Sequence, residues 1–317
     1  MKTGKFIISL DFEIHWGGFE KWDINRKKKY FLNSRNSIPS VLKLFEENDI
    51  EATWATVGFL FAKNKKQLES LSPKLKPTYL NKKLSYYNYF SQIGLNEIDD
   101  PFHYAGDIIS LINKTKGQEL ACHTYSHYYC NEEGQTIQQF DEDLKSAQII
   151  SKKNFNVELK SLVFPRNQIN KDYLDIVINN GFKVVRSNPN VWFWQKTNGV
   201  FSRIFRAIDT LITISSSLCF GKILKYKTLD ILPASRFFRP YKKTEKFIQN
   251  LKIKRIKKEM YFAAKNNLNY HLWWHPHNFG EDIDKNMEQL ENIIKYYQYL
   301  NSKFNFISKN MINIQNE

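Results

Sequence analysis

Two histidines and two acidic residues have the types and the spacing of a metal-binding site. His123 and His127 are four residues apart, so on a helical turn their imidazoles would face the same way and could share one ion. Asp11 and Glu13 follow a short apolar run, and alternation along an extended strand turns both carboxylates to one side. The histidine spacing alone is weak evidence, but beside a carboxylate pair it favours a metal site.

Such a ligand set leaves coordination positions open, and two kinds of chemistry use it. One is hydrolysis by an activated water, and the other is oxygen chemistry at non-haem iron. Two further histidines, His275 and His277, flank Pro276 near the end of the chain. The proline biases His275 towards an extended conformation at the end of a strand, so we expect His275 to take part in catalysis. For His277 we expect a structural or substrate hydrogen bond, and His15 is left undecided.

The elements that must position these residues alternate along the chain. A helix over 37–48 is expected to have Ser37 as N-cap and Pro39 in its first turn. Repeated strand-to-helix order predicts parallel strands with right-handed crossovers, hence an α/β sheet or barrel whose reactive residues gather at the strand ends. Iron oxygenases usually have double-sheet β-folds, so this order favours hydrolysis. The expected strands are 5–10, 51–57, 118–122, 160–164, 182–186 and 268–274, and the other helices are 102–115, 136–152, 171–179, 244–266 and 284–301.

Two stretches do not fit this alternation. Residues 63–101 are polar and rich in Lys, Tyr and Pro, and residues 190–238 are aromatic and rich in Ser. We interpret both as insertions that shape a site. Because no internal repeat and no Gly/Ser linker is visible, residues 1–317 are expected to form a single catalytic domain.

Four segments, in this order, resemble the polysaccharide deacetylase family, the NodB-homology or carbohydrate esterase family 4 enzymes. Ser9–Glu13 (SLDFE) is similar to the family's T-F-D-D-like motif, and Ala52–Gly58 (ATWATVG) is similar to A-T-F-F-x-x-G. Gly117–His127 (GQELACHTYSH) matches the histidine motif, and Leu272–His275 (LWWH) matches the closing L-x-x-H motif. The resemblance implies a distorted (β/α) barrel, a divalent metal, a carboxylate base and a histidine acid.

Placed on this sequence, the resemblance implies roles for particular residues. Asp11 is expected as the base, with Glu13, His123 and His127 as metal ligands and Asp11 as an alternative ligand. His275 is expected as the general acid. The segment Phe164–Asn167 stands where the family has Arg-Pro-Pro-Tyr, so Arg166 is expected to orient the base. The expected substrate contacts are Trp16, Asn167, Arg236, His277 and Trp274.

The charge and the cysteines bear on the partners. The net charge is +15, but Lys, Asn and Ile are abundant throughout, so we do not infer a specific nucleic-acid partner. An anionic membrane surface or a phosphate-bearing glycan is the preferred partner. Three cysteines without a CxxC pair indicate a reducing compartment, and no apolar leader follows Met1, so we expect a cytoplasmic protein.

We therefore predict a metal-dependent hydrolase that removes an N-acetyl group from a sugar during O-antigen or capsule synthesis. The sugar could be lipid- or nucleotide-linked. Zinc is the favoured metal, with cobalt, nickel, manganese and iron as alternatives. The rival interpretations are an amidohydrolase of a non-sugar C–N bond and a glycan-binding protein without activity.

Overall fold

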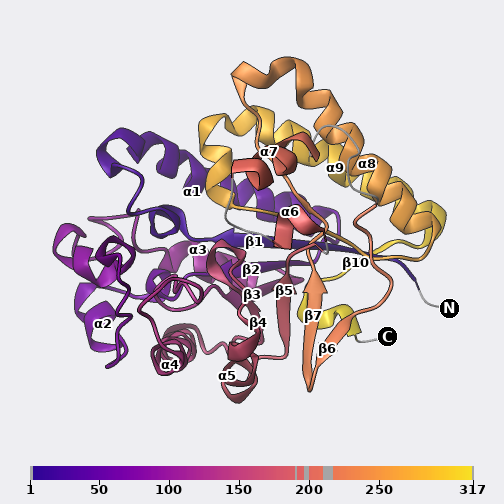
Figure 1. The fold of residues 1–317 in the computed structure, drawn as a ribbon. Coiled ribbons are helices and arrows are strands. Elements are labelled where there is room, and N and C mark those ends of the chain that lie inside the picture. Colours follow the sequence, from indigo (N-terminus) through magenta and orange to yellow (C-terminus); the bar gives the residue numbers. More distant parts are fainter. Residues whose placement is uncertain (1–2, 190, 196–199, 210–216, 316–317) are drawn as a thin grey trace.

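The computed structural model describes residues 3–189, 191–195, 200–209 and 217–315. Its centre is a sheet of mostly parallel strands (Figure 1). The strand order is β6-β7-β5-β4-β3-β2-β1-β9-β8, with β10 paired to β1. The strands are β1 (Lys5–Phe12), β2 (Ala52–Thr56), β3 (Gln118–Cys122), β4 (Ser161–Val163), β5 (Val184–Ser187), β6 (Leu224–Tyr226), β7 (Leu229–Pro233), β8 (Arg236–Phe237), β9 (Tyr270–Trp274) and β10 (Ile307–Ser308).

One continuous segment closes this sheet into a barrel. Its first part, β7, pairs in parallel with β5, and its second part, β8, pairs in parallel with β9. The two residues between them continue both pairings, because Ala234 N donates to Ser187 O and Ser235 N donates to His271 O. This agrees with the expected distorted (β/α) barrel. It also places part of the 190–238 stretch in the barrel wall, whereas the sequence suggested an insertion.

Helices surround the barrel (Figure 1). Several begin with a side-chain cap, among them α4, where Thr136 and Gln139 form a reciprocal capping box. Among the described residues, no helix is both long enough and apolar enough to span a bilayer. The helices are α1 (Ile24–Glu47), α2 (Lys65–Ser70), α3 (Gly106–Lys114), α4 (Ile137–Phe155), α5 (Leu174–Asn179), α6 (Trp192–Gln195), α7 (Val200–Asp209), α8 (Gln249–Lys265) and α9 (Ile283–Phe304).

Helix α1 begins well before the predicted start at residue 37. Asp23 caps it by accepting a hydrogen bond from Asn25 N, and the helix continues through Pro39. Ser37 is therefore an interior residue whose hydroxyl donates to Ser34 O at 2.7 Å. Burial of Phe31 stabilises the first turns of the helix. The lysine run at 27–29 gives this part of the sequence no apolar pattern, so the sequence did not predict these turns.

Alternate residues of the strands point into the barrel. Ile7, Ala121 and Val184 belong to one buried cluster, which also includes Met311 and Ile314. Residues two or four positions further along each strand share that side, so the strands deliver Asp11, His123 and Arg186 to the carboxyl end of the barrel. At the other end, β10 lies beside the start of β1, and the 3-10 turn Ile312–Gln315 covers the opening.

Candidate active site

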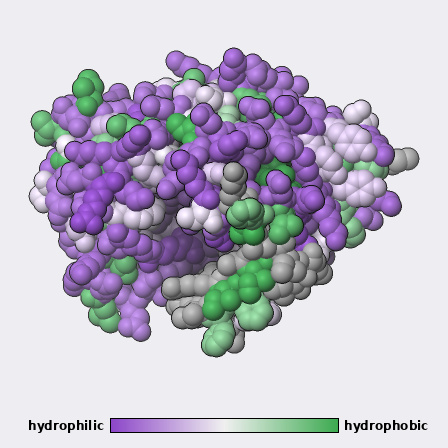
Figure 2. Space-filling view, turned by 90° about the horizontal axis from the view of Figure 1, so that it is seen from above, coloured by the Kyte–Doolittle hydropathy of each residue, from purple (hydrophilic) through white to green (hydrophobic). Residues whose placement is uncertain are grey.

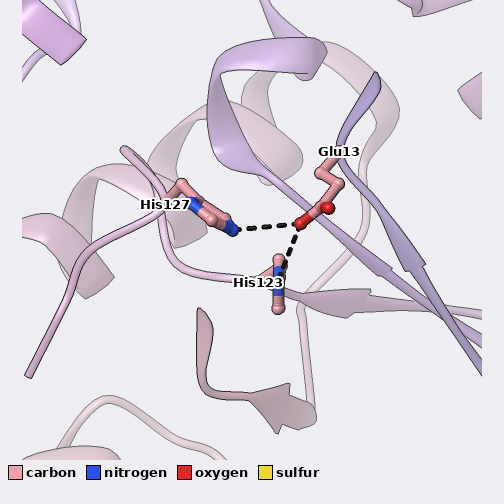
Figure 3. A group of neighbouring side chains, drawn as sticks. All are labelled: Glu13, His123 and His127. Carbon is pink, nitrogen blue, oxygen red and sulfur yellow. Dashed lines mark hydrogen bonds and ion pairs between the residues drawn. The ribbon is translucent and has the colours of Figure 1, made fainter. Parts of the chain in front are cut away.

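The carboxylate of Glu13 lies between two imidazoles (Figure 3). Its Oε2 is 3.0 Å from His127 Nε2 and 3.3 Å from His123 Nε2. One ligand atom from each of the three residues lies within 4.8 Å of the other two, and all three residues are buried. A carboxylate oxygen with two imidazole nitrogens is a set that zinc and other divalent metals bind, so this triad fits the metal that the sequence predicts.

The two histidines are carried by a tight loop rather than by the expected helical turn. Thr124 and His127 have positive φ angles of 60° and 55°. Asp143 of α4 stabilises the loop, because its carboxylate accepts hydrogen bonds from Tyr125 N at 2.6 Å and from Ser126 N at 3.1 Å. The left-handed backbone brings both rings to the same carboxylate without a helix.

Hydrogen bonds at the far nitrogens orient both rings. His123 Nδ1 donates to Val163 O at 2.8 Å, and His127 Nδ1 lies 3.0 Å from the hydroxyl of Tyr129. These bonds turn each Nε2 towards Glu13. A neutral ring that donates through Nδ1 has its lone pair on Nε2, which is the arrangement that a metal-binding histidine requires.

A chain of polar side chains continues behind His127. The Tyr129 hydroxyl is 2.6 Å from that of Tyr86, which donates to Glu20 Oε2 at 2.7 Å. Glu20 in turn accepts from Arg166 Nη2, and the Arg166 guanidinium lies over the Tyr129 ring at 4.0 Å. Tyr86 comes from the 63–101 stretch, so this insertion supports a histidine of the triad.

Arg166 does not orient Asp11, contrary to the expectation from sequence. Arg186, at the end of β5, makes a bidentate ion pair with Asp11, with Nη1–Oδ1 at 2.6 Å and Nη2–Oδ2 at 2.7 Å. The same guanidinium donates to Ser9 Oγ at 3.0 Å and to Asn167 Oδ1 at 2.9 Å. Arg166 is held away by Glu20 and Glu132.

Burial and charge act in opposite directions on both carboxylates. Burial raises the pKa of Glu13, but His275, His123 and His127 together hold this pKa well below its usual value. Burial likewise raises the pKa of Asp11, whereas Arg186 and His123 lower it to a value below the ordinary one. Both groups are therefore carboxylates near neutral pH, as a metal ligand and a base require.

His275 and His277 differ in access to solvent. The His275 side chain is 26% exposed, and its Nε2 lies 3.7 Å from Asp11 Oδ2 and 3.6 Å from Glu13 Oε1. The His277 side chain is only 4% exposed, with Nδ1 at 3.7 Å from Glu13 Oε1. Burial lowers the pKa of His277 to about 3, with a further contribution from His275. The neutral His277 ring stacks on His275 at a centroid distance of 5.0 Å.

Three of the five expected substrate contacts are buried elsewhere. The Trp16 indole is inaccessible and donates to His103 O, and Trp274 lies in the core against Phe45 and Phe238. Arg236 forms a buried bidentate pair with Glu259, with both N–O distances at 2.7 Å. A guanidinium satisfied in this way cannot also bind an anionic substrate.

The other two expected contacts lie at the site. Asn167 accepts a hydrogen bond from Arg186, and His277 lies close to the Glu13 carboxylate. His15, whose role the sequence left undecided, belongs to a separate buried network of hydrogen bonds. Its Nδ1 is 2.8 Å from His103 Nε2, and its Nε2 donates to Trp22 O at 2.8 Å.

The comparisons with known proteins agree with this geometry. Residues 28–185, about half of the chain, match the polysaccharide deacetylase family. No curated protein matches the sequence. A solved structure described as a polysaccharide deacetylase from Mycobacterium smegmatis has a TM-score of 0.63 at 12% identity, covering 99% of this chain and 89% of that one.

Two further solved structures have the same fold. One is described as a polysaccharide deacetylase from Pseudomonas aeruginosa PAO1, with a TM-score of 0.51 at 10% identity, covering 96% of this chain and 86% of that one. The other is an allantoinase, with a TM-score of 0.51 at 12% identity, covering 96% of this chain and 85% of that one. At these identities the likeness concerns the fold alone. With the family match and the Glu13, His123 and His127 triad, we conclude that the chain belongs to the polysaccharide deacetylase family.

Proposed function

We propose that this protein is a metal-dependent hydrolase that removes the acetyl group from an N-acetylated sugar. The observation that carries the proposal is that the triad of Glu13, His123 and His127 lies beside the Asp11–Arg186 pair and the partly exposed His275. A ligand triad, a charged base and a histidine open to solvent are the groups that amide hydrolysis needs. Residues 1–317 would form one catalytic domain.

The metal would be held by Glu13 Oε2 and by the Nε2 atoms of the two triad histidines. When bound, it would activate a water molecule and polarise the acetyl carbonyl group. Zinc is the metal we favour.

The chain's own residues would move the protons. Asp11 would accept a proton from the attacking water, and Arg186 would hold the carboxylate in place for that transfer. His275 Nε2 would donate a proton to the sugar nitrogen as the C–N bond breaks. His277 would keep the His275 ring in position by stacking on it.

The substrate we propose is a sugar of a surface-polysaccharide precursor, carried by a lipid or a nucleotide, and modified in the cytoplasm at the inner face of the membrane. The net charge of +15 supports an anionic, phosphate-bearing carrier. Screening acts over about 10 Å at 0.1 M salt, so kcat/KM on a diphosphate-linked substrate should fall as salt rises. A salt-independent kcat/KM would argue against that carrier.

Acetate release from a panel of N-acetyl sugar nucleotides and lipid-linked glycans, with and without chelator, tests the proposal. We expect release from at least one substrate, its loss with chelator and its recovery with zinc. A cyclic ureide in the same panel tests the alternative of a non-sugar amidohydrolase. Hydrolysis of the ureide alone would replace the proposed substrate. Metal binding without any hydrolysis would instead indicate a glycan-binding protein.

A further inference from the structure

The short helix α7 exposes an apolar face. Phe201, Ile204 and Ile208 are spaced three and four residues apart and are all exposed, Phe201 to 76%. This spacing puts them on the same side of the helix. Figure 2 shows hydrophobic residues gathered on part of the face seen from above.

Contacts with α6 and with strand β8 of the barrel fix α7 in place. Phe205 packs against Trp192 of α6, with ring centroids 5.0 Å apart and the planes at 65°. At the end of α7, the Asp209 carboxylate is 3.3 Å from Arg236 Nη1 of β8. Phe205 and Asp209 follow Phe201 and Ile208 on one flank of the helix, so these two contacts fix α7 in place while Phe201, Ile204 and Ile208 stay exposed.

The α6–α7 pair adjoins the candidate active site. Trp194 of α6 contacts Trp273 of β9, with ring centroids 6.3 Å apart. The Trp273 ring lies 4.4 Å from the Arg186 guanidinium and 5.7 Å from the His275 ring. One tryptophan therefore separates α6 from the proposed acid and from the arginine that holds the base.

Positive charge lies on the same side of the barrel. A cavity of about 960 Å³ extends from Asn167 and Asn188, at the carboxyl ends of β4 and β5, to Lys171, Lys222 and Lys225. Within the described chain, Lys171 and Lys222 form no ion pair with a carboxylate, whereas Lys225 lies 3.6 Å from Asp230. Asn167 lines this cavity and also accepts a hydrogen bond from Arg186, so the cavity lies next to the arginine that holds the base.

We propose that the exposed face of α7, together with Lys171 and Lys222, binds the surface of an anionic lipid bilayer. Apolar side chains beside cationic ones are the combination with which a peripheral protein enters the headgroup region. A second copy of this chain fits less well, because a two-fold contact through this face would bring the same lysines of both copies together. The inference rests on the proposed function in one respect, since it explains how the site would reach a lipid-linked substrate.

Co-sedimentation of the full chain with vesicles tests this surface. We expect the protein to sediment with vesicles of phosphatidylcholine and phosphatidylglycerol at 3:1, and less with pure phosphatidylcholine. The double variant Phe201→Ser/Ile204→Ser should bind the anionic vesicles at least about tenfold more weakly, because two apolar side chains no longer enter the bilayer. Lys171→Gln/Lys222→Gln should weaken binding to the anionic vesicles only.

A matched control carries the same kind of change on another surface. Leu95 and Ile98 precede α3 and are exposed, Ile98 to 93%. Leu95→Ser/Ile98→Ser should bind vesicles like the unaltered protein. The proposal is overturned by equal losses in the two double variants or by no binding of the unaltered protein to anionic vesicles. A dimer in solution that Phe201→Ser/Ile204→Ser dissociates, without vesicle binding, would identify a second copy as the occupant.

The binding assay is independent of catalysis. Vesicle binding needs neither metal nor substrate, so it should persist in chelator. Deacetylation of a water-soluble N-acetyl sugar should be unchanged in Phe201→Ser/Ile204→Ser, because neither residue contacts the site. Vesicle binding without acetate release from any substrate would leave the membrane surface supported and reject the proposed reaction alone.

Discussion

Arg186 and Asp11 face each other inside the barrel as a bidentate ion pair with N–O distances of 2.6 and 2.7 Å. Both side chains are almost completely buried. Replacing Arg186 with Leu would leave the Asp11 charge buried without its partner. We expect a loss of about 3–5 kcal/mol in the free energy of unfolding and a large fall in kcat. Urea denaturation and acetate release measure the two effects.

Arg186→Lys and Arg166→Leu are the controls for this pair. Lysine keeps the charge but not the two-pronged geometry, so Arg186→Lys should lie between the unaltered protein and Arg186→Leu in kcat. Arg166 does not contact Asp11, so its removal should affect kcat much less than Arg186→Leu. A larger loss of kcat in Arg166→Leu than in Arg186→Leu would restore the assignment that the sequence suggested.

Tyr129→Phe should weaken metal binding while leaving the three ligands in place. The substitution removes the hydroxyl that lies 3.0 Å from His127 Nδ1, and loss of such a supporting hydrogen bond typically costs 10- to 100-fold in metal affinity, so about that much is expected here. Competition with a chromophoric chelator measures the affinity. His127→Ala should lose metal and activity together.

Tyr128→Phe provides the matched control. The Tyr128 hydroxyl donates to Gln135 Oε1, away from the triad, so its removal should leave metal affinity unchanged. Equal affinity in Tyr129→Phe and the unaltered protein would show that the hydroxyl does not support His127. Full metal content in His127→Ala would reject that residue as a ligand.

His275→Ala should lose on the order of 10²–10⁴-fold in kcat with little change in metal content, the usual contribution of a general acid. The basic limb of the pH–rate profile should disappear with it. A substrate whose leaving group needs no proton should restore much of the rate. If His277→Ala shows this behaviour while His275→Ala remains active, the acid is misassigned by two residues.

Asp143 should make stability depend on pH. Burial raises its pKa to about 7, although hydrogen bonds from Ser126 and from the backbone of Tyr125 lower it. An aspartate in the unfolded chain titrates near pH 3.9, so the folded protein binds this proton more tightly. The stability that Asp143 contributes is therefore full below about pH 4 and is lost as the pH rises through 7.

The variant Asp143→Asn isolates this contribution, because an amide does not titrate. The free energy of unfolding of the unaltered protein, relative to that of Asp143→Asn, should fall by roughly 2–3 kcal/mol between pH 5 and 7, since each pH unit corresponds to about 1.4 kcal/mol. Urea denaturation across this range measures it. A difference that stays constant or grows with pH would show that Asp143 is ionised in the folded protein.

The sequence predicted the strands that carry the reactive residues because their signal is local. Apolar runs that end in Asp11, His123 and His275 mark strand ends, and the carboxyl ends of parallel strands must meet at one face. Whether two side chains meet across the barrel is a different matter. Arg166 follows the expected strand 160–164, and Arg186 is the last residue of the expected strand 182–186. Only the closed barrel, in which β5 and β1 are separated by three strands, shows that Arg186 rather than Arg166 pairs with Asp11.

Other differences have the same origin in tertiary contacts. Trp16 stands beside the site in sequence, yet the turn after Glu13 carries its ring into the core. The sequence did not predict the start of α1 at Ile24. Asp23 caps this helix, but its first turns are stable only because they bury apolar side chains against the rest of the protein. Strands β7 and β8 are short and are flanked by polar residues, so their sequence resembles that of a loop. Only their pairing with β5 and β9 identifies them as strands.

The pairing of β10 with β1 has a consequence for how the protein is made. A ribosome synthesises β1 first, but this strand lacks two of its neighbours, β9 and β10, until residue 308 has emerged. The turn at 312–315, which covers the barrel opening, follows later still. Truncations between residues 278 and 306 should therefore remove activity even though every reactive residue is present, and nascent chains stalled there should expose β1 to chaperones and proteases.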